Sequence, residues 1–119
     1  MKQELAGNGR AATPNRALPR GMLTLAVQLA ATVSGVASEA VVSARRHSAR
    51  TSAARQLAMY LAHTSFGLPF SAVGHCFGRD RTTAAHACRR VEERRDDPAF
   101  DAELIEIERL LALAAEART

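Results

Sequence analysis

The sequence has few of the residues on which β-sheets and disulfide-scaffolded domains depend. It contains no tryptophan, one tyrosine and four phenylalanines, so aromatic residues make up only 4% of its 119 positions. Since strands favour β-branched and aromatic residues, this scarcity and the abundant alanine favour a helical fold. Two cysteines, Cys76 and Cys88, are too few for a disulfide-scaffolded secreted domain. The length suits one domain and leaves little for a second.

Lysine is almost absent too, and the charge is uneven. Lys2 is the single lysine, and the other fifteen basic residues are arginines. The formal net charge of +4 divides into +3 over residues 1–20, +6 over residues 21–95 and −5 over residues 96–119. A basic stretch before an acidic end is typical of a nucleic-acid-binding unit followed by a solvated or partner-facing helix.

A long hydrophobic run is also missing. Basic residues followed by an apolar stretch over 22–33 imitate a signal peptide, but Thr24, Gln28 and Thr32 interrupt that stretch. Glu39 then ends it short of the about 20 apolar residues that a membrane-spanning helix needs. We therefore expect an amphipathic helix here, no membrane association, and a protein of the cytoplasm and nucleoid.

The pattern along the chain predicts an all-α fold. Residues 1–20, with several glycines and prolines among polar residues, indicate a disordered basic arm, and residues 21–119 a single helical domain. No segment alternates as a strand should, and apolar periodicity predicts about six helices. They are expected at about 22–33, in a short stretch after Ser38 that carries Val41 and Val42, and at about 53–65, 72–77, 81–94 and 98–116.

Capping residues set the expected helix starts. Ser38 is expected to cap the short helix that carries Val41 and Val42. Thr51 or Ser52 is expected to cap the helix over 53–65, Ser71 the next, and Asp80 the one over 81–94. Asp97 followed by Pro98 marks the start of the last helix, because proline fits the first helical position. One face of that last helix is expected to pack inward through Leu104, Ile107, Leu110, Leu111 and Ala114.

Two consecutive helices with a short glycine-containing turn, over 71–95, predict a helix-turn-helix. The second helix divides into an inward face and a polar face suited to a major groove, because arginine donates two hydrogen bonds to guanine and a threonine methyl contacts a thymine methyl. A plainer interpretation is a solvated face, on which Arg89, Arg90, Arg94 and Arg95 pair with Glu92 and Glu93. The inward residues are Ala84, Ala87, Cys88 and Val91, and the polar face holds Arg81, Thr82, Thr83, His86, Arg89 and Arg90.

Three segments carry a more specific resemblance. Residues 78–92, GRDRTTAAHACRRVE, resemble the signature of the C-terminal DNA-binding domain of DnaA, the bacterial chromosomal replication initiator family. Residues 55–62, RQLAMYLA, and 73–78, VGHCFG, resemble upstream helices of that domain, and the similarity extends over about 23–111. It implies a helix-turn-helix fold of the Trp-repressor-like type that binds a short asymmetric box of double-stranded DNA.

The resemblance also implies site residues. In that family the residues at the start of the recognition helix enter the major groove, an arginine of a basic loop reaches the minor groove, and further residues contact the DNA backbone. Carried over by position, the major-groove residues are Asp80, Arg81, Thr82, Thr83 and His86; the minor-groove candidates are Arg45, Arg46 and Arg50, among which the sequence does not choose; and the backbone contacts are Arg55, Gln56, Ser71, Arg79, Arg89 and Arg90.

Two of the departures from the family pattern bear on function. Arg81 stands where the family usually has histidine, so the preferred base there is open. No Gly-x-x-x-x-Gly-Lys-Ser/Thr phosphate loop is present, so the resemblance is to the DNA-binding domain without its ATPase module. We expect a protein that binds DNA, has no enzymatic activity and needs no nucleotide or other cofactor. Its role would be in transcriptional regulation or in the control of replication initiation, and the sequence does not decide between the two.

Two other patterns in the sequence suggest different functions. His75, Cys76, His86 and Cys88 are possible zinc ligands, but they lack the close paired spacing of a zinc finger, so no metal is expected. The acidic face of the helix over 98–116 makes an interaction protein the main alternative. This helix would dock a partner or a second subunit, with only non-specific DNA affinity elsewhere.

Overall fold

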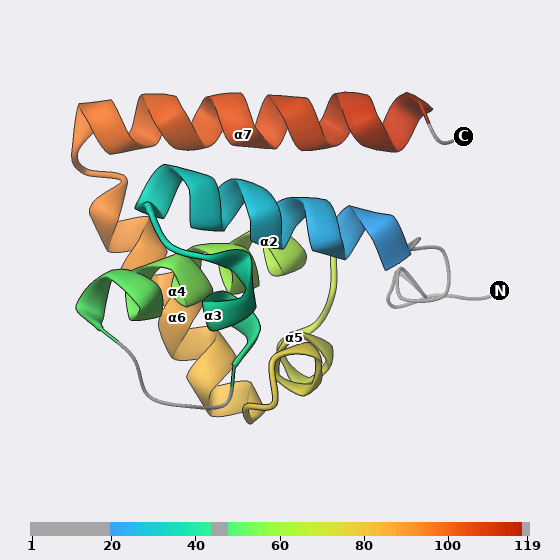
Figure 1. Cartoon of the computed structure of the whole chain (residues 1–119), viewed down its shortest axis with the longest axis vertical. Helices are drawn as coiled ribbons and strands as arrows, with labels where there is room; N and C mark the ends of the chain where they lie inside the picture. The colour runs from blue at the N-terminus through green and yellow to red at the C-terminus, as the bar shows by residue number, and fades with distance from the viewer. Residues whose placement is uncertain (1–19, 44–47, 118–119) are drawn as a thin grey trace, which may run out of the picture.

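Helices alone build the described part of the chain, which in this computed structural model comprises residues 20–43 and 48–117. Within these ranges there are six helices and no strand, which confirms the predicted all-α class (Figure 1). The predicted arm over 1–20 lies outside them except for Arg20. The helices are α2 (Arg20–Ser34), α3 (Ser38–Val42), α4 (Ala49–Thr64), α5 (Phe70–Cys76), α6 (Arg81–Arg94) and α7 (Pro98–Ala117).

The central helix is α4. All residues from Leu57 to Ala62 are buried, with none more than 3% exposed. A helix that is buried on every side must be enclosed by other elements, and α4 packs against α2 on one side and α6 on the other. The outer helix α7 lies alongside α2, at the opposite end of the molecule from the first turn of α6 (Figure 1). None of the described helices combines the length and apolar character needed to span a bilayer.

Three predicted helix starts are wrong. Ser38 is the first residue of α3 and not its cap, because Ala37 is the N-cap and makes no side-chain bond. Helix α4 begins four residues early, because the Ser48 hydroxyl accepts a hydrogen bond from the Thr51 backbone N–H at 3.2 Å and caps it. Thr51 is instead a buried residue inside the helix. Helix α5 begins directly after Pro69, whose extended backbone is the N-cap without any side-chain bond, and Ser71 lies in its first turn.

The other two predicted starts are confirmed. The Asp80 carboxylate accepts a hydrogen bond from the Thr83 N–H at 2.8 Å and caps α6. Asp97 accepts from the Ala99 N–H at 3.1 Å, and α7 begins at Pro98.

The inward face of α7 is narrower than predicted. Leu104, Ile107 and Leu111 are buried, and Ala114 is partly buried, as expected. Leu110, however, is 42% exposed. Because α7 is an outer helix that packs on α2, only a narrow stripe of it is covered, and Leu110 falls outside that stripe.

Candidate nucleic-acid interface

The turn between α5 and α6 fixes how the two helices meet. The Gly78 N–H donates to the His75 carbonyl at 3.2 Å, and the Arg79 N–H donates to the Gly74 carbonyl at 2.8 Å. This pair of bonds closes a helix C-terminus around a left-handed residue. Gly78 supplies that residue with φ of +66°, a conformation that side-chain-bearing residues rarely adopt.

Gly74 allows a second close approach in the same place. A Cβ atom at this position would lie 2.7 Å from the carbonyl oxygens of both Arg79 and Asp80. Because these are backbone atoms, the turn would have to move to admit even alanine. The two glycines therefore hold the first turn of α6 tightly against α5, and so set the direction in which α6 leaves the turn.

The division of α6 into two faces is confirmed. Ala84, Ala87, Cys88 and Val91 are buried against the core. Arg81, Thr82, Thr83, His86, Arg89 and Arg90 are all exposed. The start of α6 therefore presents a guanidinium group, two hydroxyls and an imidazole together on one open surface.

Asp80 lies at the edge of this surface, and its carboxylate already accepts a hydrogen bond from the first turn of α6. Hydrogen bonds from Thr83, above all from its backbone N–H, hold the pKa of the Asp80 carboxyl below its usual range. The carboxylate is exposed, and an ionised carboxylate has more acceptor sites than one cap bond uses. It therefore caps α6 and is still able to accept a bond from a cytosine amine.

A groove between α4 and α6 collects residues that lie far apart in the sequence. Its cavity has a volume of about 130 Å³. Five residues with predicted DNA contacts line it. They come from α4 (Arg55, Gln56), from the turn before α6 (Arg79) and from α6 itself (Thr83, His86). Ser52 and Met59 line it as well. Sequence reasoning missed these two, since their proximity to α6 arises only from helix packing.

Arg55 has a structural position as well as a predicted DNA contact. It is 8% exposed, and its Nε donates to the Val41 carbonyl at 2.8 Å. Its Nη2 donates to the Ala40 and Ser43 carbonyls at 3.2 Å each. Burial, and to a smaller extent the neighbouring positive charge of Arg79, lower the pKa of Arg55. Arg55 therefore fastens α3 to α4 and leaves positive charge at the groove.

The remaining predicted site residues that the structure describes lie in the turn before α6 and at the starts of α4 and α5. The Arg79 Nη1 donates to the Phe77 carbonyl at 3.0 Å. Arg50 is exposed in the first turn of α4, and Ser71 is exposed in the first turn of α5. Arg45 and Arg46 lie outside the described residues, so Arg50 is the minor-groove candidate that the structure places.

The solvated-face interpretation of the α6 arginines is wrong for two of them. Arg90 does approach Glu93, with Nε and Oε1 3.9 Å apart. The Arg94 guanidinium instead lies over the Phe100 ring, 3.9 Å from its centre. Arg95 is mostly buried and links three helices.

Arg95 joins α4 to α7. Its Nη1 donates to the Tyr60 hydroxyl at 2.9 Å and to Glu108 at 3.0 Å, and its Nε donates to Asp101. The Tyr60 hydroxyl in turn donates to Glu92 of α6 at 2.8 Å. The Glu108 bond is the main reason that the pKa of Arg95 is raised. This network fastens the closing helix to the helix-turn-helix.

The possible zinc ligands show no clustering in the part of the chain that the structure describes. No group of three or more histidine, cysteine, aspartate or glutamate side chains there is placed to hold a metal ion. Cys88 is buried, and this burial with the nearby Glu92 charge raises the pKa of its thiol to about 11. Cys76 is exposed on α5.

Comparison with known proteins agrees with this geometry. A family model described as "Bacterial dnaA protein helix-turn-helix" matches residues 26–91, more than half of the chain. The chain is similar to proteins named "Chromosomal replication initiator protein DnaA" from Acinetobacter baumannii strains AYE, SDF and ACICU. Each is 46% identical over 59 residues, which cover 48% of this chain. The match spans 13% of the length of each relative.

Proposed function

Because the chain belongs to the family of bacterial DnaA helix-turn-helix domains, a family of DNA-binding modules and not of enzymes, we propose that it binds a specific site in double-stranded DNA. The site is a short box of the kind that the initiator domain recognises. The observation that carries the proposal is the continuity of two surfaces. The exposed start of α6 runs into the groove that Arg55 and Arg79 line.

The two surfaces suit different parts of a duplex. Thr82, Thr83 and His86 are short enough to let α6 approach base edges, and Arg81 can reach guanine with two hydrogen bonds. The positive charge of Arg79 and Arg55 suits a phosphate group beside the groove, where contacts fix register without reading sequence. The exposed Arg50 would contact the adjacent minor groove or backbone.

In the cell, such a protein acts at the chromosome, in the cytoplasm and nucleoid. It regulates transcription or modulates replication initiation by occupying boxes. A genome-wide footprint separates these roles, since clustering of bound sites near the origin supports replication control and scattered promoter sites support transcription. The absence of any enriched site would favour the interaction-protein alternative with non-specific DNA affinity.

The decisive experiment has two stages. Selection from random duplex DNA identifies the preferred box and shows whether Arg81 has shifted a base preference. Binding of Thr83→Ala and His86→Ala to that box is then measured against random DNA, with the exposed Thr32→Ala of α2 as a matched control.

We expect the two α6 variants to lose roughly 1–3 kcal/mol at the box and little on random DNA, and the control to lose nothing on either. Equal losses on both DNAs would contradict base reading by α6.

Arg50→Ala tests the backbone contacts. It should lower affinity for both DNAs and reduce the slope of log affinity against log salt by about 1, the value for one phosphate contact. An unchanged slope would remove Arg50 from the interface. Arg55 is a poorer choice, because its replacement also breaks the bonds that hold α3.

A further inference from the structure

Helix α7 exposes a regular row of side chains on the side that α2 does not cover. Two large apolar residues stand in it, Leu110 and Leu113, which are 42% and 49% exposed. The members recur at alternating intervals of four and three residues, and every one is exposed. The α7 row consists of Ala99, Glu103, Glu106, Leu110, Leu113 and Ala117.

This spacing matters because a repeat of 3.5 residues is the interval at which one helix packs along another. Single exposed leucines are ordinary on protein surfaces. Two leucines in this register, with alanine at either end of the row, make a strip on which a second helix can lie. The buried stripe of α7, with Leu104 and Ile107, is a separate face that already packs inward.

The row is acidic in its first half and apolar in its second. Glu103 and Glu106 precede the two leucines, and Arg109 donates to Glu106 from the same helix. That ion pair gives Glu106 a basic partner within α7, so Glu103 supplies most of the negative charge that the row offers to another molecule. A binding partner would therefore need basic groups at one end and apolar groups at the other.

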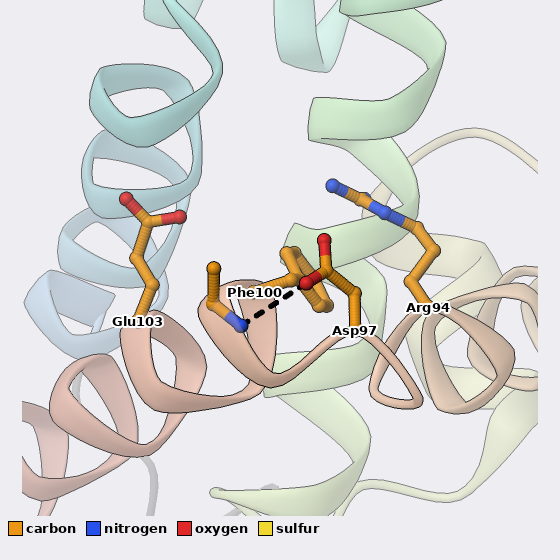
Figure 2. A pocket seen from close by; sticks show the side chains of 5 residues that line it. Arg94, Asp97, Phe100 and Glu103 are labelled. Carbon is orange, nitrogen blue, oxygen red and sulfur yellow. Dashed lines mark hydrogen bonds between the residues drawn. The ribbon is translucent and has the colours of Figure 1, made fainter.

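A cavity of about 500 Å³ continues the acidic end of the row (Figure 2). Phe100 lies within it beneath the Arg94 guanidinium, and Asp97 and Glu103 also line the cavity, with Glu103 set apart from the other labelled residues in Figure 2. Two carboxylates against one guanidinium give the lining a net negative charge. The aliphatic stem and charged head of a lysine or arginine suit such a site.

A second copy of this chain does not match the row. Two copies in parallel register would place Glu103 against Glu103 and Glu106 against Glu106, which is repulsive. Two antiparallel copies with the whole row aligned would place each glutamate against a leucine. The distribution of charge therefore favours a different protein as the partner.

We propose that the α7 row binds an amphipathic helix of another protein. Apolar side chains of that helix cover Leu110 and Leu113, and its lysine or arginine side chains meet Glu103, Glu106 and the cavity. Helix α7, which carries the row, lies at the opposite end of the molecule from the first turn of α6 (Figure 1). The chain can thus hold this partner and DNA at the same time.

The test uses the full chain and two synthetic helical peptides, measured by fluorescence anisotropy. One peptide carries leucines in one half of its strip and lysines in the other half, and the second has glutamates in place of the lysines. We expect the basic peptide to bind and to weaken with salt, and the acidic peptide to bind on the order of tenfold or more weakly.

Matched variants locate the binding. Leu110→Gln with Leu113→Gln should weaken the basic peptide on the order of tenfold or more, and Glu103→Gln should weaken it and flatten its salt dependence. Ile105→Gln, at an equally exposed residue of α7 outside the row (51%), should leave binding unchanged. Circular dichroism and DNA affinity equal to wild type show that each variant is folded, whatever box the protein prefers.

Three outcomes would overturn the proposal. One is equal binding of both peptides, or equal effects of Ile105→Gln and the leucine pair. A second is sedimentation of the full chain as a dimer that the leucine pair converts to monomer, which would assign the row to a second copy. The third is peptide binding that appears only after removal of residues 1–19, which would assign it to the chain's own first residues.

Discussion

Replacing Arg95 tests whether the closing helix is held by a buried network or by apolar packing alone. The Arg95→Ala change removes hydrogen bonds to Tyr60, Asp101 and Glu108 at once. Bonds to charged groups contribute roughly 1.5–3 kcal/mol each when buried, but exposed ion pairs contribute at most about 1 kcal/mol. The side chains here are 19% exposed for Arg95, 35% for Asp101 and 29% for Glu108, so most of the full value is lost to solvent screening.

We therefore expect Arg95→Ala to lower the free energy of unfolding by about 2–3 kcal/mol. At roughly 4–8 °C per kcal/mol for a domain of about 100 residues, the melting temperature should fall by about 8–24 °C. Urea denaturation followed by circular dichroism measures the loss. Arg90→Ala is the control, because Arg90 is 55% exposed and its Nε lies 3.9 Å from Glu93. It should change stability by less than about 0.5 kcal/mol. A loss for Arg95→Ala no larger than for this control would refute the network as a stabilising element.

Further measurements test the turn between α5 and α6, the tyrosine Tyr60 and the two cysteines. Gly74→Ala should lower the free energy of unfolding by about 1–3 kcal/mol, because its Cβ would lie 2.7 Å from backbone oxygens. A Cβ at Gly78 would meet no atom within 4 Å. Urea denaturation should therefore show a smaller loss for Gly78→Ala, about 1–2 kcal/mol, from the left-handed backbone conformation alone. Tyr60 is the one tyrosine of the chain, and burial, together with its bond to Glu92, raises its pKa above 10.0, so its ultraviolet titration should end at higher pH in the folded than in the unfolded protein. Because folding raises this pKa, the stabilisation that comes from protonated Tyr60 is complete below the pKa of the unfolded protein. It is lost as the pH rises through the pKa of the folded protein. If the free energy of unfolding falls at alkaline pH equally in Tyr60→Phe and in the wild type, this interpretation is contradicted. A thiol reagent should modify the exposed Cys76 in the native protein and the buried Cys88 only on unfolding; equal rates would show that α6 opens readily.

The elements of the helix-turn-helix could be predicted because their signals are local. Asp80 caps the helix that begins one residue later, and Ala84, Ala87 and Val91 mark its inward face by spacing alone. The start of α4 was missed because several hydroxyl residues compete there, and the earliest, Ser48, is the one that caps. Where neighbouring residues offer the same capping chemistry, the sequence does not rank them.

The missed parts of the site depend on contacts between distant segments. Arg95 and Tyr60 are 35 residues apart, so no periodicity links them, and the four arginines near the end of α6 look alike in the sequence. Arg55 resembled a DNA contact, and its bonds to the α3 carbonyls require the packing of α3 on α4. The exposure of Leu110 likewise follows from how α7 lies on α2.

The tight turn around Gly74 and Gly78 has a consequence for the DNA binding that we propose. Since backbone hydrogen bonds of 3.2 and 2.8 Å close the turn between α5 and α6, and Gly74 leaves no room for a side chain there, α6 is already ordered before it meets a duplex. Little conformational entropy would then be lost on binding. A helix held in this way would not tilt to follow a poorly shaped groove, so in the proposed complex the duplex would adapt to the protein. Sites should then be ranked by the bending energy of base steps that no side chain touches as well as by the bases that are contacted.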